Sequence, residues 1–327
     1  MDRRRRRTWT LGLLVASIGT LAAAQAADVP LRAMRWLSPG ADPAVVLTRA
    51  PGECVRAPRG DPEQALLVEV GRAAFRTPVV LGGQAARAGL SCESCHRNGR
   101  GNAQFHFPGV SGAPGTADVT SSLFSSHRGN GVDDPKPIPD LGGPKADLKV
   151  AQSPGDPELE RFLHGLVVEE FDGPEPPPVV LKGLAAYVRA MDPGLCPAGP
   201  RPLRAAAWIA DAGRDAATAA TLAGRGDRPG ALVMIQAARA RLGDLDERYA
   251  APELKPLRAR LRDADARLAA IAQDLRAGRP QAAPALARWR RDARALGADL
   301  AAREARSLFN PARLSQANNR RLPAKPS

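Results

Sequence analysis

The sequence predicts an all-α protein in two parts: a small helical unit with long wrapping loops, followed by an antiparallel helical bundle. The length of 327 residues suits two folded units. Between residues 60 and 197, helix signals are separated by stretches rich in Gly and Pro with little helical or strand periodicity. From residue 201 onward Ala, Leu, Arg and Asp dominate, and Gly or Pro occurs mostly at breaks between long helical segments.

The first unit contains local helix signals at its start. Asp61 provides an N-cap, and Pro62 follows it in the first helical turn. Apolar residues at positions 65, 66, 70 and 73 repeat at helical spacing, so we expect a helix over 62–75. Further helices are expected at 94–98, 157–170 and 179–191, with a long ordered loop between 99 and 157.

In the second unit, Gly and Pro divide the chain into four helices, near 203–223, 230–249, 253–277 and 282–307. The third of these has apolar residues at spacings of three and four, which is the pattern of a helix with one buried face. An antiparallel bundle would bury such faces against one another. The apolar positions of the third helix are Leu257, Leu261, Ala264, Leu268, Ile271 and Leu275.

The first residues have the three parts of a secretory signal peptide: arginines at 3–7, an apolar run at 11–24, and Ala-Gln-Ala at 24–26. The apolar run is about 14 residues, shorter than the roughly 20 that a spanning helix needs. We therefore expect cleavage near Ala26 and a periplasmic mature protein. The predicted organisation is a signal peptide (1–26), an extended N-terminal arm (27–58), the loop-rich unit (59–200), the bundle (201–310) and a flexible basic tail (311–327).

The motif Cys92-Glu93-Ser94-Cys95-His96 has the C-x-x-C-H spacing of covalent haem attachment. On a helical turn, residues three and four apart share a face, so both thiols can form thioethers with one porphyrin while His96 binds its iron. A closed zinc site would need a second pair of ligands, and a thiol redox pair would favour a βαβ context. We therefore expect one haem c in a cytochrome c-like fold, with an iron-binding, metal-binding site at His96.

Pro108 lies twelve residues after His96. Its carbonyl is a candidate acceptor for the second N–H of the ligand imidazole, a bond that would fix the ring and tune the iron. The alternative is that Pro108 only turns the loop.

The sixth iron ligand decides between electron transfer and peroxide chemistry, because a saturated iron carries electrons while an open iron binds small oxidants. His106 is the first candidate, since it lies in an aromatic, loop-like stretch close to the motif. A structural role for His106 and an open iron site both remain possible. The other candidates are His127 and Met191, then Met34, His164 and Met234.

Cys54 and Cys196 remain after the motif has taken its two cysteines, and they flank the loop-rich unit. In an oxidising compartment an even remainder predicts a disulfide, the alternative being two unrelated buried thiols.

Several stretches around the motif resemble the bacterial di-haem cytochrome c peroxidases and their methylamine-utilisation relatives. The resemblance covers residues 60–195 and implies an all-α cytochrome c fold with a periplasmic redox role. Members of that family carry two C-x-x-C-H motifs, whereas this chain has one. The matching stretches are Gly71-Arg72-Ala73-Ala74-Phe75, Leu81-Gly82-Gly83, the motif itself, Ile138-Pro139-Asp140-Leu141, Glu170-Phe171-Asp172-Gly173 and Leu184-Ala185-Ala186-Tyr187-Val188.

With a single motif, we expect a periplasmic mono-haem electron carrier. The alternative function is peroxide reduction, or peroxide sensing, at an open iron. Peroxide cleavage would need an acid-base group above the iron, and Glu169, Glu170 and Asp172 are the candidates, although such carboxylates are commonly solvated loop residues.

The positive charge is concentrated in the second unit, where Lys and Arg outnumber Asp and Glu by 25 to 13 from residue 201 onward. Residues 27–200 carry 17 basic against 20 acidic residues. An exported chain with scattered aromatic residues in its basic part is a poor candidate for nucleic acid. We expect an acidic redox partner to dock on the bundle, with peripheral attachment to an anionic membrane as a further possibility and a merely solvated basic surface as the bland alternative.

Overall fold

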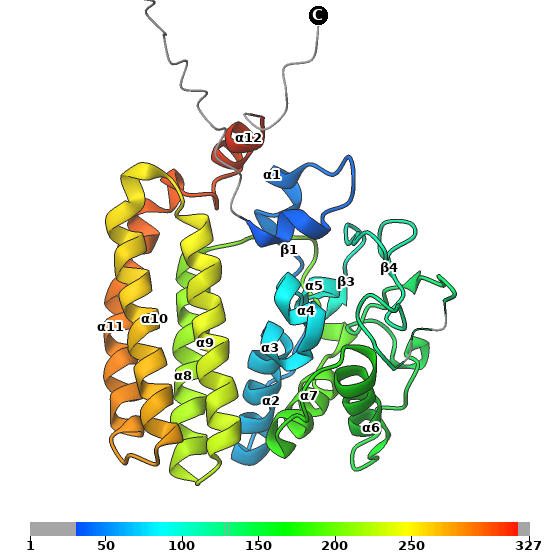
Figure 1. The fold of residues 1–327 in the computed structure, drawn as a ribbon, viewed down its shortest axis with the longest axis horizontal. Coiled ribbons are helices and arrows are strands. Elements are labelled where there is room, and N and C mark those ends of the chain that lie inside the picture. The colour runs from blue at the N-terminus through cyan, green and yellow to red at the C-terminus, as the bar shows by residue number, and fades with distance from the viewer. Residues whose placement is uncertain (1–30, 128, 130, 320–327) are drawn as a thin grey trace, which may run out of the picture.

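The computed structural model describes residues 31–127, 129 and 131–319, so the predicted signal peptide at 1–26 lies outside the described residues. The described chain is built mainly from helices, which confirms the all-α class (Figure 1). Within this part of the chain, no helix combines the length and the apolar character needed to span a membrane.

The loop-rich unit contains two helices that cross at close range. Helix α2 (Pro62–Phe75) begins and ends at the predicted residues, with the Asp61 side chain accepting from the Gln64 N–H at 2.9 Å. Helix α7 (Pro178–Arg189) lies within one or two residues of its predicted range. The shorter helices of this unit are α3 (Pro78–Leu81), α4 (Gly83–Ala88), α5 (Cys92–Cys95) and α6 (Glu158–Gly165), and α6 continues as one π-helical segment, Leu166–Glu170.

Glycines allow α2 and α7 to meet backbone to backbone. A Cβ atom added to Gly71 would lie 1.9 Å from the carbonyl oxygen of Gly183, which is far inside contact distance. This close approach brings the Phe75 ring within 5.2 Å of the Tyr187 ring, centroid to centroid. The crossing of the two helices therefore fixes the positions of Phe75 and Tyr187, the aromatic residues behind the C-x-x-C-H motif.

The second unit is the predicted antiparallel bundle, with helix bounds within a few residues of those expected. In α10, the six apolar positions predicted to share one face are all buried. Asp227 caps α9 by accepting from the Gly230 N–H at 2.8 Å. The bundle helices are α8 (Ala205–Gly224), α9 (Arg228–Arg248), α10 (Lys255–Arg276) and α11 (Ala282–Arg303).

The two units share one hydrophobic core. Helix α2 lies beside α8 and α9 in Figure 1, and buried residues of α2 and α7 belong to the same cluster as those of the bundle. Tyr187 of α7 and Ile235 of α9, for example, are both fully buried in it. The change of composition near residue 200 is therefore not accompanied by a break in the core.

Strands are short, in agreement with the wrapping loop expected after residue 99. They form antiparallel pairs, in which His96 of β2 lies opposite Gly101 of β3 and Arg49 of β1 opposite Pro202 of β6. The strands are β1 (Arg49–Ala50), β2 (His96–Arg97), β3 (Arg100–Gly101), β4 (Thr116–Ala117), β5 (Lys136–Pro137) and β6 (Arg201–Pro202), with β4 paired to β5. The 3₁₀ segments are Arg32–Trp36, Lys145–Asp147, Pro193–Leu195, Pro252–Leu254 and Glu304–Arg306.

The N-terminal arm and the C-terminal segment pack together. The arm includes helix α1 (Pro43–Val46), and residues predicted to form a flexible tail instead form helix α12 (Pro311–Asn319). Leu314 of α12 is fully buried against Leu31 and Leu47 of the arm. This contact explains the helix, because Leu314 gains an apolar partner that lies far away in the sequence.

Asp215 of α8 provides a pH test of the α8 packing. Burial raises its pKa to about 7, and Asp211 adds to the effect, while Arg241, Arg76 and Arg214 oppose it. The pKa of Asp215 is higher in the folded protein than in the unfolded chain. The contribution of this side chain to stability is therefore fully present below the unfolded-state pKa and is lost as the pH rises through about 7. Each pKa unit corresponds to about 1.4 kcal/mol.

We expect Asp215→Asn to match the natural protein near pH 4 and to be more stable at pH 8 by about 1–2 kcal/mol, a value reduced because the side chain is partly exposed. Urea unfolding of both proteins at the two pH values measures this difference. An equal difference at pH 4 and pH 8 would contradict the assignment.

Candidate functional site

The C-x-x-C-H motif forms a single helical turn, α5, held by a capping box. The Ser91 side chain accepts from the backbone of Ser94, and the Ser94 hydroxyl accepts from the Ser91 N–H at 3.1 Å. The turn ends at His96, where the chain enters the β2–β3 hairpin. The predicted helix over 94–98 is therefore wrong in its bounds, because the cap starts the helix earlier and the hairpin stops it at Cys95.

Both motif cysteines are half-buried and contact a group of apolar side chains, here called the aromatic cluster. Burial raises the pKa of each thiol to about 12, with a small opposing backbone hydrogen bond at Cys92. The thiols are therefore protonated at neutral pH. The buried members of the aromatic cluster are Trp36, Leu81, Ala85, Leu90, Phe105, Val110, Ala117 and Phe124, and the partly buried Phe107, Ile138 and Phe171 pack against it.

His96 is held as a neutral imidazole with a defined tautomer. Its Nδ1 lies 3.0 Å from the carbonyl oxygen of Pro139, which can only accept, so Nδ1–H is the donor. Burial lowers the pKa of His96 to about 4, against the opposing effects of the Pro139 carbonyl and Asp140. The Nε2 atom consequently carries a lone pair, as a metal-binding imidazole requires.

The acceptor of the His96 N–H was predicted wrongly. The candidate was Pro108, whereas the structure uses Pro139, 43 residues after His96. The loop that carries Pro139 returns to the motif because Arg100 binds Asp140, with Nε at 2.8 and 2.7 Å from the two carboxylate oxygens. Pro108 was chosen by its distance from His96 along the sequence, and such a distance cannot show that a later loop folds back to the motif. The stretch Ile138-Pro139-Asp140-Leu141 had, however, been recognised as one of those that resemble the di-haem peroxidases.

The predicted disulfide is confirmed: Cys54 and Cys196 are bonded across 142 residues. It lies against the same returning loop, since a Cβ added to Gly142 would be 3.1 Å from the Cys54 sulfur. The guanidinium of Arg100 is also 3.6 Å from that sulfur. The disulfide and the Arg100–Asp140 pair thus support the loop that positions Pro139.

The proposed sixth ligands lie in different environments, and their roles stay predictions. His106 lies between Phe105, a buried member of the aromatic cluster, and Phe107, which packs against the cluster. Its main-chain N–H donates to the Trp36 carbonyl oxygen at 3.0 Å. Met191 is 2% exposed and packs on Gly99, where an added Cβ would be 2.4 Å from the Met191 methyl. Gly99 also has φ +77, so two independent reasons favour glycine there.

The remaining candidates for the sixth iron ligand contact other parts of the protein. His164 is 2.8 Å from Glu175, and His127 is 3.9 Å from Asp172. Met234 is fully buried in the shared core, while Met34 packs against the cluster of Leu31, Leu47, Leu308 and Leu314.

Of the carboxylates considered for acid-base work, Glu169 and Glu170 lie in the π-helical segment after α6, and Glu170 is buried. Asp172 accepts from the Ser126 N–H at 2.9 Å.

The expectation of an iron-binding, metal-binding site at His96 is contradicted for the side chains of the protein itself. Throughout the described residues, no group of three or more His, Cys, Asp or Glu side chains could hold a metal ion. His96 stands as a single imidazole beside two thiols.

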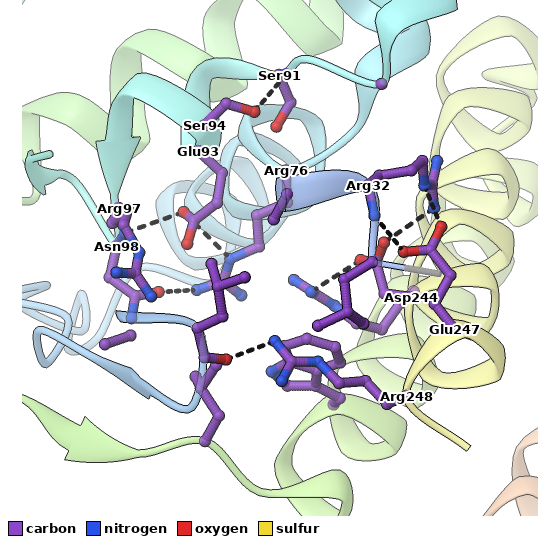
Figure 2. Close-up of a pocket in the computed structure, with 18 of the residues that line it drawn as sticks. Arg32, Arg76, Ser91, Glu93, Ser94, Arg97, Asn98, Asp244, Glu247 and Arg248 are labelled. Carbon is purple, nitrogen blue, oxygen red and sulfur yellow. Dashed lines mark hydrogen bonds and ion pairs between the residues drawn. The ribbon is translucent and has the colours of Figure 1, made fainter. Parts of the chain in front are cut away.

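A charged pocket of about 400 Å³ lies behind the motif and was not predicted from the sequence. Glu93 and Ser94, the residues between the two cysteines, line one wall, and α9 lines another (Figure 2). Arg76, the residue after α2, links the motif wall to α8 and to the arm, with nitrogens 3.9 Å from Glu93, 3.5 Å from Asp211 of α8 and 3.2 Å from Glu53 of the arm. Because its residues come from the arm, the motif and the bundle, no local sequence pattern could have revealed the pocket.

Comparisons with family models, with curated proteins and with solved structures find no match for this chain.

Proposed function

We propose that this protein is a periplasmic mono-haem c-type cytochrome that transfers electrons, with the loop-rich unit in a cytochrome c-like arrangement. Cys92 and Cys95 would hold the porphyrin through thioethers, and His96 would be an axial ligand of its iron. The observation that carries the proposal is the His96 imidazole, which burial keeps neutral and Pro139 orients, directly after two half-buried thiols. The resemblance to di-haem peroxidases favours the same class.

The residues at the motif fit a porphyrin better than a bare metal ion. A porphyrin brings four nitrogen ligands of its own, so the chain needs to supply only one or two axial side chains. It also needs apolar surface, which the aromatic cluster provides with three partly exposed members beside the thiols, Phe107, Ile138 and Phe171. When bound, haem c supplies a one-electron Fe(III)/Fe(II) couple.

The chain's own residues would set the properties of that couple. Pro139 fixes the His96 ring and increases its basicity through the Nδ1–H bond. Arg100 and Asp140 keep the Pro139 loop in place, and the Cys54–Cys196 disulfide supports it from behind. These contacts hold the axial ligand in one orientation, so little rearrangement would accompany electron transfer.

Location and partner belong to the same proposal. A disulfide is typical of an oxidising compartment, and the signal-like start of the chain points to export into the periplasm. The excess of Lys and Arg after residue 200 supports an acidic redox partner that docks on the bundle, with an on-rate that falls as salt is added.

The test is production of the full chain in a host competent in cytochrome c maturation. We expect a red protein whose haem stays attached after denaturation, and a Cys92→Ala, Cys95→Ala double variant that loses all covalent haem. Ser94→Ala is the matched control, because it changes the same turn while keeping the C-x-x-C-H spacing, and it should retain the haem. A colourless natural protein of unmodified mass would overturn the proposal.

The spectrum then separates electron transfer from peroxide chemistry. A reduced protein whose spectrum is unchanged by carbon monoxide has both axial positions filled, which supports a carrier. Rapid carbon monoxide binding together with reaction with peroxide would contradict the carrier function.

A further inference from the structure

The pocket behind the motif is lined by six arginines and five carboxylates, and the ion pairs among them leave two of the arginines without a carboxylate in direct contact. Each carboxylate in its wall already pairs with an arginine other than Arg97 and Arg248. Asp244 lies 3.0 Å from Arg32 and 3.2 Å from Arg241, and Glu247 pairs with Arg32 as well. Glu53, Glu93 and Asp211 all pair with Arg76.

Arg97 and Arg248 lack such partners. Among the residues that the structure describes, no carboxylate oxygen lies within 4.0 Å of either guanidinium. Arg97 donates to the main-chain oxygen of Arg49 at 2.6 Å. Arg248 donates to the main-chain oxygens of Leu308 and Leu47 at 2.9 and 2.6 Å. A guanidinium has five N–H donors, so these bonds leave donor capacity on both side chains.

Arg248 is also buried to an unusual degree for a cation, with 5% of its surface exposed. Burial lowers its pKa to about 10, the nearby charge of Arg97 adds to this effect, and Asp244 and Glu247 oppose it. Trp208 lies under its guanidinium at 5.2 Å and provides further contact. A buried cation without a carboxylate in direct contact is costly, and a bound anion would reduce that cost.

We propose that this pocket binds a small oxyanion such as phosphate or sulfate between Arg97 and Arg248. The two side chains come from different elements, Arg97 from β2 after the motif and Arg248 from the last turn of α9, and both line the pocket (Figure 2). The volume of about 400 Å³ is ample, since a water molecule needs about 30 Å³. Guanidinium forks match the oxygens of such anions in geometry and charge.

The test uses the full chain, with the haem content recorded separately. Inorganic phosphate is titrated calorimetrically at constant ionic strength set with chloride. We expect saturable 1:1 binding in the millimolar range or tighter, and Arg97→Met should weaken it by about tenfold or more, the loss expected for one charge-assisted contact. Arg97→Lys keeps the charge, so its phosphate affinity should lie between that of the natural protein and that of Arg97→Met.

Arg204→Met is the matched control. Arg204 also lines the pocket but is largely exposed and pairs with Glu304 at 2.9 Å, so its removal should change phosphate affinity less than twofold, roughly within 0.4 kcal/mol. Circular dichroism checks that each variant is folded. Absence of binding up to about 10 mM phosphate or sulfate, well beyond a millimolar site, would overturn the proposal. Equal affinity for the natural protein and Arg97→Met would overturn it as well.

Discussion

Gly71→Ala is expected to destabilise the protein by about 3 kcal/mol, because it places a methyl group inside the α2–α7 contact. The new Cβ would lie 1.9 Å from the Gly183 carbonyl oxygen and 2.6 Å from the Tyr187 Cβ. Neither neighbour can rotate away, since one is backbone and the other is the first side-chain atom. The two helices would have to separate, which would also loosen the Phe75–Tyr187 contact. Urea unfolding of the full chain measures the effect.

Gly213→Ala provides the control for helix propensity. Gly213 lies in the middle of α8, and a Cβ added there would meet no atom within 4 Å, so Ala should stabilise the protein by about 0.5–1 kcal/mol. The same substitution thus has opposite signs at the two positions. A neutral Gly71→Ala would show that α2 and α7 do not meet at these glycines.

Removing the disulfide is expected to have the largest effect on stability. Replacing Cys54 and Cys196 by Ser releases a loop of 142 residues, and the chain-entropy relation gives a loss of about 4–5 kcal/mol. The free energy of unfolding, measured in urea for the double variant and for the natural protein with and without reductant, tests this. Reduction should lower the stability of the natural protein to that of the variant and leave the variant unchanged.

The double variant Cys92→Ser, Cys95→Ser is the matched control when all proteins are made without cytochrome maturation. It also removes two cysteines but keeps the disulfide, so its unfolding free energy should not show the loss of about 4–5 kcal/mol expected for the opened loop. A loss below about 1 kcal/mol in the Cys54, Cys196 variant would contradict the chain-entropy account.

Local signals predicted the long helices well. The bounds of α2 follow from an Asp-Pro start and the apolar spacing within a single segment, and the same kind of signal located α8 to α11. The pairing of Cys54 with Cys196 was also accessible, because only two cysteines remained after the motif was set aside.

Features that depend on distant segments were missed. Pro139 reaches His96 only because Arg100 and Asp140 fold its loop back, and α12 is stabilised by an arm from the opposite end of the chain. The shared core of the two units also depends on contacts between distant segments, and the change of composition near residue 200 does not show it. Residue spacing carries no information on such long-range contacts.

Arg76 lies between the bundle and the cysteine turn and contacts both. A single guanidinium reaches Asp211 on α8 at 3.5 Å and Glu93, between the two cysteines, at 3.9 Å. A partner that docks on the bundle and tilts α8 would pull on this side chain and hence on the turn itself. Arg76 therefore connects a bundle helix to the turn that carries the two cysteines through ion pairs.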